Sequence, residues 1–242
     1  MTTKRLVIIP TFNEKENAEA IVRKVLGLSM PFDMLIIDDG SPDGTAQIVK
    51  NLQLEFGHRL HLVERAGKQG LGTAYITGFK WALERGYEHI CEMDADFSHN
   101  PDDLLRLSVA CDDGADLAIG SRYITGVNVV NWPMKRVMQS YYGSAYVRKV
   151  LGIRVRDMTA GFKCYTRRAL ATIDFNRIRM KGYGFQIEMK YTVIKLGFNV
   201  VEVPIIFVDR KLGSTKMSGG IFREALWGVL KLKFRKIRGK IN

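Results

Sequence analysis

Short apolar runs alternate with longer segments of helical spacing through the first half of the chain. The apolar runs predict five strands, at residues 6–9, 34–37, 60–63, 89–93 and 116–119. The segments between them have the apolar spacing of helices, at residues 16–28, 43–56, 71–85 and 101–111. This alternation predicts an α/β fold with a mostly parallel central sheet and helices on both faces.

The second half of the chain loses this regular alternation after about residue 121. Residues 131–151 mix aromatic, apolar and basic side chains in a pattern typical of an amphipathic helix, residues 200–208 predict a strand, and a helical pattern runs from residue 221 onwards. We find no internal repeat and no low-complexity linker. We therefore expect one main domain over residues 1–218, followed by a basic amphipathic helical extension over residues 219–242.

Acidic residues follow three of the predicted strands. In sheets of this kind ligands bind beyond the carboxyl ends of the strands. Asp94 and Asp96 follow the fourth predicted strand, and in an extended backbone their side chains point the same way. Two carboxylates this close favour Mg²⁺ or Mn²⁺, with substrate phosphates completing the ligand shell. The alternative is a loop carboxylate that caps the helix starting near Pro101.

A second acidic pair, Asp38 and Asp39, follows the second predicted strand. A carboxylate at this position commonly binds ribose hydroxyls or base donors, and the alternative is a tight turn with Asp43 as helix N-cap. The glycine-rich segment at residues 67–73 matches neither a P-loop nor the GxGxxG pattern. The kinase, ATPase and dehydrogenase classes are therefore disfavoured.

The charge of the chain points to an anionic partner. The 242 residues include 37 basic and 25 acidic side chains, a formal net charge of +12, so nucleic acid, a phosphorylated substrate and anionic lipid all remain open. Arg122, Arg210 and Lys216 follow late strands and suit phosphate oxygens. The carboxylates at the strand ends would repel a nucleic-acid backbone, and we expect no nucleic-acid partner.

The C-terminal segment combines apolar periodicity with positive charge. Between residues 231 and 240 it has six cations and no acid, while Phe222, Leu226, Leu230 and Phe234 recur every four residues. A basic amphipathic helix of this kind indicates membrane-surface binding. Nucleic-acid contact and a core-packing helix with a solvated tail are the alternatives. No apolar run is long enough for a membrane span, and three scattered cysteines favour a reducing, cytoplasmic setting.

Two sets of short motifs lie along the chain. The first set is IPTFNE at residues 9–14, IDDGS at 37–41 and DAD at 94–96. The second set is GSPDGT at 40–45, GLGTAY at 70–75, DFSHNP at 96–101, GSRY at 120–123, DMTAGF at 157–162, GYGFQIEM at 182–189, FVDR at 207–210 and STK at 214–216. The first set resembles the family 2 glycosyltransferases of the GT-A fold, and the second set narrows the resemblance to the dolichyl-phosphate mannose synthases within that family. The resemblance spans about residues 5 to 232.

This resemblance implies roles for individual residues. The nucleoside would be held by Pro10, Phe12, Glu14, Ile37 and Asp39. Asp94 and Ala95 would lie along the nucleotide sugar. Asp96 would bind the divalent metal, with Asp94 and Ser98 as further candidate ligands. Arg122, Arg210 and Lys216 would hold phosphates or the sugar and, with Asp96, form the catalytic set. Phe12 replaces a tyrosine common in the family, and Ser98 replaces a glutamine that some members use as a metal ligand.

The activity that the resemblance implies is transfer of mannose from GDP-mannose to a dolichyl or other polyprenyl monophosphate, with inversion at the anomeric carbon. The alternative is a UDP-glucose or UDP-N-acetylglucosamine dependent polyprenyl-phosphate transferase. The implied location is cytoplasmic and peripheral at the membrane face. The resemblance leaves open whether a membrane anchor subunit is needed.

Overall fold

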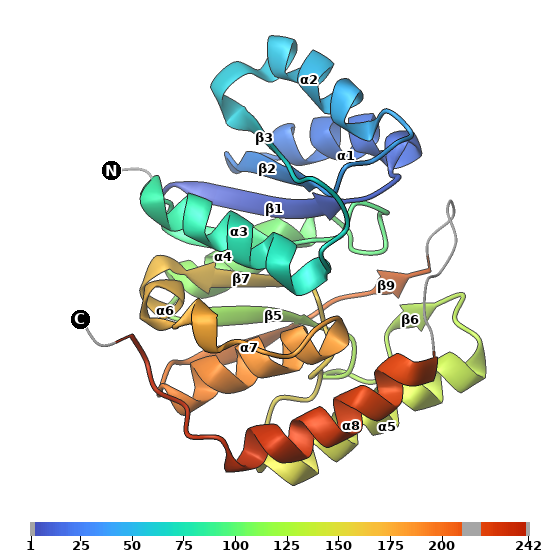
Figure 1. Cartoon of the computed structure of the whole chain (residues 1–242), viewed down its shortest axis with the longest axis vertical. Coiled ribbons are helices and arrows are strands. Elements are labelled where there is room, and N and C mark those ends of the chain that lie inside the picture. Colours follow the sequence, from blue (N-terminus) through green and yellow to red (C-terminus); the bar gives the residue numbers. More distant parts are fainter. Residues whose placement is uncertain (1–2, 210–218, 241–242) are drawn as a thin grey trace.

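The computed structural model describes residues 3–209 and 219–240, and its centre is a seven-stranded sheet (Figure 1). Across the sheet the strands follow the order β3 (Leu60–Glu64), β2 (Asp33–Asp38), β1 (Arg5–Thr11), β4 (His89–Glu92), β7 (Lys163–Thr166), β5 (Leu117–Ser121) and β8 (Val200–Pro204). Every pairing is parallel except those of β7, which runs antiparallel to β4 and β5. The predicted mostly parallel sheet is confirmed.

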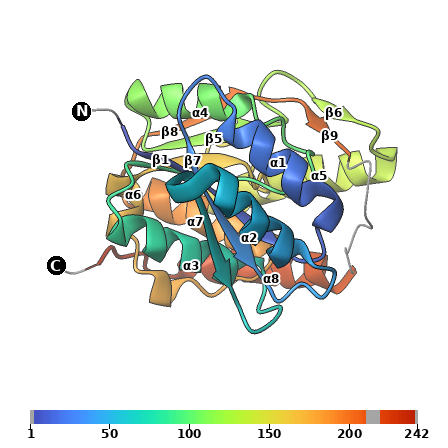
Figure 2. The ribbon, with the colours of Figure 1, turned by 90° about the horizontal axis from the view of Figure 1, so that it is seen from above.

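Helices cover both faces of the sheet because successive strand side chains point to opposite sides. In β1, Val7 and Ile9 join one core cluster, and Leu6 and Ile8 join the other. Three helices pack on the Val7 face: α1 (Lys15–Leu26), α2 (Thr45–Phe56) and α4 (Asp103–Asp112). The opposite face is covered by α3 (Leu71–Glu84), α5 (Met134–Leu151), α6 (Arg167–Thr172), α7 (Tyr183–Lys195) and α8 (Gly219–Phe234) (Figure 2).

Two elements of the fold, α7 and β7 (Lys163–Thr166), are absent from the sequence prediction. Helix α7 is buried nearly all round, from Gly184 to Val193, and buries Gln186, Glu188 and Lys190, so it has no polar face for a pattern to reveal. Strand β7 has only four residues and begins with a fully buried lysine. The strand predicted at residues 200–208 is two strands, because the chain leaves the sheet after β8 and β9 (Phe207–Val208) pairs with β6 (Val129–Val130).

Helix α8 packs into the same core as the rest of the chain. Its Val229 and Leu232 are buried in the cluster that also contains residues of α3 and α7. Arg235, just after the helix, forms an ion pair with the fully buried Glu188 of α7. The domain boundary at residue 218 therefore stays a prediction. In the described part of the chain, no helix is both long and apolar enough to span a membrane.

Candidate active site

The two acidic residues at the end of β2 have separate tasks. Asp38 is buried and accepts hydrogen bonds from Thr11 Oγ1 at 2.9 Å and from the Ser41 backbone N–H and hydroxyl at 2.8 and 2.6 Å. These bonds tie the end of β1 to the turn after β2. Asp38 is therefore a structural residue, and Asp39 is the carboxylate left to face a ligand.

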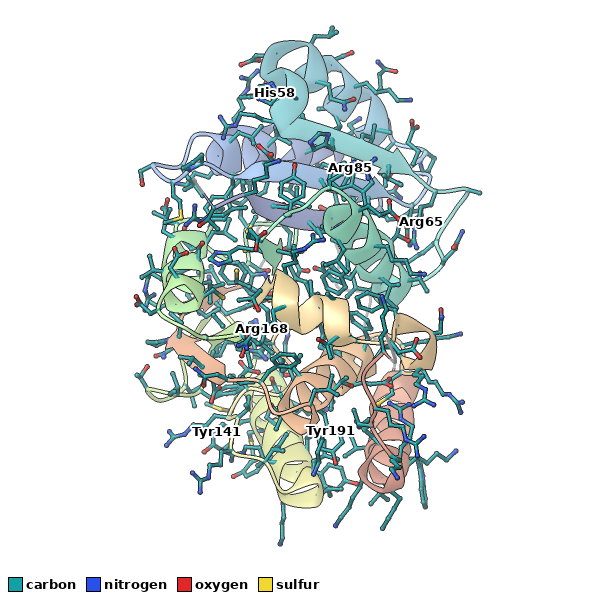
Figure 3. All side chains as sticks on the ribbon, turned by 90° about the vertical axis from the view of Figure 1, so that its left-hand side faces the viewer. His58, Arg65, Arg85, Tyr141, Arg168 and Tyr191 are labelled. Carbon is teal, nitrogen blue, oxygen red and sulfur yellow. The ribbon has the colours of Figure 1, made fainter. Side chains whose placement is uncertain are left out.

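Asp39 is oriented by an arginine that the sequence analysis missed. Arg65, which follows β3 and is labelled in Figure 3, donates from Nε to Asp39 Oδ1 at 2.6 Å, and its Nη2 lies 2.5 Å from the same oxygen. Its Nη1 donates to the Thr73 hydroxyl at the start of α3. Oδ2 of Asp39 has no hydrogen-bond partner among the described residues. The position of Arg65 at a strand end is the signal that could have revealed it.

The remaining predicted nucleoside residues differ in how far they can reach a ligand. Pro10, Phe12 and Glu14 are half-buried at the end of β1, and Lys68 Nζ lies 5.0 Å from the centre of the Phe12 ring. Ile37 is fully buried in the core, opposite Pro10 in the sheet register. Ile37 can therefore contact a ligand only through its backbone.

The loop after β4 brings the two candidate metal carboxylates to the same edge. Asp96 is 8% exposed and its Oδ1 accepts the Ser98 backbone N–H at 3.1 Å, whereas the Asp94 side chain is 42% exposed. Between Asp96 and Ser98, Phe97 adopts φ 58°, a left-handed conformation that is rare for a bulky side chain. Such strain often marks a functional loop.

A buried histidine supports this loop. His99 is stacked on Phe162, with ring centres 4.9 Å apart, and its Nδ1 accepts the Asp94 backbone N–H at 3.4 Å. Burial lowers the pKa of His99 to about 4, although the neighbouring Asp96 acts to raise it. The ring is therefore neutral at pH 7, which leaves Nδ1 free to act as an acceptor. His99 supports the acidic loop and is no candidate general base.

The donor set of this loop suits a hard divalent cation that shares its ligands with a substrate. In residues 3–209 and 219–240, no three His, Cys, Asp or Glu side chains form a group that could hold a metal alone. Mg²⁺ commonly binds through one or two carboxylates, with waters and substrate phosphates as the other ligands. Asp96 and Asp94 provide that number of carboxylates. Ser98 is 2% exposed, so its side chain is a weaker candidate ligand.

Arg122 follows β5 and is held in a fixed orientation. Its Nε and Nη2 each donate to the Asp157 carboxylate at 2.7 Å, and Nη2 also donates to the Thr159 hydroxyl at 2.8 Å. Burial acts to lower the pKa of Arg122, but Asp157 outweighs it and raises the pKa above its usual value. The guanidinium is charged, and Nη1 has no hydrogen-bond partner among the described residues.

A second arginine contacts the same aromatic ring as Arg122 and was also missed. Arg136 of α5 forms an ion pair with Asp209 at 2.8 Å and stacks over the Trp132 ring at 4.0 Å. The same ring lies 5.4 Å from the Arg122 guanidinium carbon. Within the amphipathic pattern Arg136 was one basic residue among several, and nothing singled it out. Arg210 and Lys216 lie outside the described residues.

Comparison with known proteins agrees with this geometry. Residues 6–174 match the family model described as glycosyl transferase family 2. The chain belongs to this family. The predicted activity class, a glycosyltransferase, is thereby confirmed.

Two similar proteins cover nearly the whole length of this glycosyltransferase. The polyprenol monophosphomannose synthase of Mycolicibacterium smegmatis is 47% identical over 241 residues, which is 100% of this chain and 90% of that protein. The undecaprenyl-phosphate mannosyltransferase of Micrococcus luteus is 46% identical over 229 residues, 93% of each.

Solved structures confirm the GT-A type of fold. The glucosyl-3-phosphoglycerate synthase of Mycobacterium tuberculosis, crystallised with Mn²⁺, UDP-glucose and phosphoglyceric acid, superimposes with a TM-score of 0.70. The match covers 96% of this chain and 80% of that one, at 17% sequence identity. A likeness at this identity establishes the architecture alone.

Proposed function

We propose that this glycosyltransferase moves mannose from GDP-mannose to a polyprenyl monophosphate and so makes a lipid-linked mannose donor. The observation that supports it best is the 46–47% identity to two mannosyltransferases whose names specify polyprenol or undecaprenyl phosphate. The identity extends over at least 93% of the chain.

The site has the groups that this reaction requires. Asp39 binds the nucleoside, and Asp96, with Asp94, holds Mg²⁺ or Mn²⁺ against the donor diphosphate. A bound divalent metal neutralises the charge that develops on the departing diphosphate. The structures of the glucosyl-3-phosphoglycerate synthase with Mn²⁺ and either UDP or UDP-glucose support a metal of this kind in the fold.

The acceptor explains why no general base is needed. A phosphate monoester has a second pKa near about 6, so the polyprenyl phosphate already carries an anionic nucleophile at neutral pH. The protein has to place two polyanions in line, which requires cations. Nη1 of Arg122, and Arg136 on the same Trp132 ring, are suited to the acceptor phosphate, and we assign Arg210 and Lys216 to the same task. Direct attack inverts the configuration at the anomeric carbon.

A second candidate function differs from the first in its sugar donor. A polyprenyl-phosphate transferase using UDP-glucose or UDP-N-acetylglucosamine needs the same metal and phosphate groups, and UDP-glucose is the sugar nucleotide of the structurally similar synthase.

Transfer of labelled sugar to a short polyprenyl phosphate, measured with each donor and Mg²⁺ or Mn²⁺, separates these functions. We expect GDP-mannose to exceed both UDP-sugars by at least about 100-fold in kcat/KM, because a site built to hydrogen-bond one base rejects another strongly. Transfer from a UDP-sugar alone would replace the proposed donor.

A lipid acceptor requires a surface that meets the bilayer, and the adjacent helices α5 and α8 provide one (Figure 1). On α5 the exposed large side chains are Met134, Met138, Tyr141 and Tyr142. On α8, Trp227 is 65% and Phe234 is 83% exposed, two turns apart on one side of the helix. Lysines and arginines flank these side chains, an arrangement typical of interfacial helices.

We propose peripheral binding to the cytoplasmic membrane face through this surface.

Replacing Trp227 and Phe234 together by alanine is expected to weaken flotation with anionic liposomes about tenfold or more, because two exposed aromatic side chains no longer enter the interface. The matched control is Leu54→Ala. Leu54 is 90% exposed on α2, at the end of the molecule opposite α5 and α8 (Figure 1), and Figure 3 likewise separates His58 from Tyr141. Equal flotation of the double variant and the wild type would rule out this surface.

A further inference from the structure

The loop that holds Arg122 has no regular secondary structure of its own. Asp157 and Thr159, the two residues that fix the guanidinium, both lie in the segment of residues 152–162 between α5 and β7. A segment without strand or helix hydrogen bonds needs other partners to keep a single conformation. The orientation of Arg122 therefore depends on what fixes this loop.

A buried lysine fixes the loop from beneath. Lys190 of α7 is fully buried, and its Nζ donates to the backbone carbonyls of Asp157 at 3.1 Å, Met158 at 3.0 Å and Ala160 at 2.7 Å. Three acceptors require three N–H donors, and only the ammonium form has three. Burial and the nearby Lys163 lower the pKa of Lys190, while Asp157 acts to raise it. The three carbonyls stabilise the charged form in place of water.

A glutamate fixes the same loop from the sheet. Glu202 of β8 accepts the backbone N–H of Arg156 at 2.7 Å and of Asp157 at 2.9 Å. It also accepts the hydroxyl of Ser121, the residue before Arg122, at 2.7 Å. The donors of the loop are thus held by β8 and its acceptors by α7. The backbone of Asp157 is thus placed by contacts that do not involve Arg122.

We propose that Lys190 is a positioning residue for transfer: by holding the carbonyls of residues 157, 158 and 160 it sets the carboxylate of Asp157, and through it the phosphate-binding edge of Arg122. Lys190 itself touches no substrate. This inference rests on the proposed role of Arg122 at a phosphate and goes beyond it, because it places a determinant of that role on a helix behind the sheet.

Lys190→Met, which keeps the length of the side chain but removes its donors, tests the proposal. We expect kcat to fall about 10- to 100-fold, the effect of misplacing a catalytic group by about 1 Å. The KM for the sugar nucleotide should stay within about twofold, because Asp39 and Arg65 do not contact the loop. The matched control is Val193→Ala, a buried change on the same helix without a hydrogen bond to the loop. It should lower the melting temperature and leave kcat, per folded molecule, unchanged.

Coupling to Arg122 separates positioning from general destabilisation. In an Arg122→Leu background, Lys190→Met should reduce kcat by less than about twofold, since residues that act through one another are not additive. An equal fold-loss in both backgrounds, or a kcat within twofold of wild type for Lys190→Met alone, would overturn the proposal. If Lys190→Met does not fold, Glu202→Gln replaces it and should lower kcat in the same direction, with an unchanged kcat as the overturning result.

Two results distinguish failure of this inference from failure of the proposed function. If the wild type transfers a sugar other than mannose, the proposed donor is wrong, and the same variants are compared with that sugar. If the wild type transfers no sugar, the inference is tested by the urea concentration at the midpoint of unfolding. Lys190→Met should lower this urea concentration less in the Arg122→Leu background than in the wild type, and equal shifts would overturn the inference.

Discussion

Asp96→Ala is expected to reduce mannosyl transfer about 1,000-fold or more. Asp96 is the buried carboxylate of the acidic loop, and its loss removes the proposed metal ligand that faces the donor diphosphate. Electrostatic stabilisation of a developing charge by a metal or by oriented donors contributes several kcal/mol, and each 1.4 kcal/mol corresponds to a tenfold change in rate. The measurement is kcat at saturating Mg²⁺ and again at saturating Mn²⁺.

The control for this variant is a nearby acid outside the site. Asp102 is an exposed partner of Lys24 at 2.7 Å on the surface, and Asp102→Ala should leave kcat within about twofold. Binding of free GDP without metal should also survive in Asp96→Ala, because Asp39 and Arg65 are unchanged. If Asp96→Ala keeps more than a tenth of the wild-type kcat, Asp96 is not the metal ligand proposed here.

Ending the chain after Ser218 is expected to abolish the cooperative fold. The truncation exposes the part of the core that Val229 and Leu232 cover, at about 1.5–3 kcal/mol for each side chain. It also leaves the buried Glu188 without Arg235, and an unpaired buried charge costs about 3–5 kcal/mol. These losses rival the whole stability of a typical domain, about 5–15 kcal/mol. Thermal unfolding followed by circular dichroism measures the outcome.

A chain ending at Lys240 is the control, because it keeps α8, the Arg235 ion pair and the hydrogen bond from the Lys240 backbone N–H to Thr172 at 2.8 Å. Its melting temperature should equal that of the full chain. If the chain ending at Ser218 melts cooperatively within a few degrees of the full one, residues 1–218 are an independent domain and the predicted boundary holds. Membrane binding is therefore better tested by surface substitutions than by this truncation.

The sequence predicts the first half of the fold well because its strands are short apolar runs between clear helical patterns. The same logic fails at α7 and β7, where polar side chains such as Lys163, Gln186 and Lys190 are buried and paired with one another or with the backbone. A prediction from the local spacing of polar and apolar residues assumes that polar residues face water. A buried polar network is specified by tertiary contacts between distant segments, so no single segment reveals it.

The residues of the candidate site likewise fall into those that the sequence predicts and those that it does not. Asp39, Asp94, Asp96 and Arg122 could be predicted because they directly follow strands, where the topology of the sheet gathers side chains. Arg65 also directly follows a strand, so its position was a usable signal, although its partner Asp39 lies 26 positions away in the chain. Arg136 could not be singled out from the other basic residues, since its importance depends on Asp209, 73 positions away. The C-terminal helix was predicted to bind a membrane surface through its apolar side. In α8, Trp227 and Phe234 are exposed, while Val229 is buried in the core.

The most direct test of the proposed reaction is the structure of the lipid that the purified protein makes from GDP-mannose, a short polyprenyl phosphate and Mg²⁺. We predict a product heavier than the acceptor by one hexose, with mannose in β linkage to the phosphate by NMR, and no product from Asp96→Ala. An α-linked product would contradict direct displacement by the acceptor phosphate. Release of free mannose without any glycolipid would contradict the proposed acceptor.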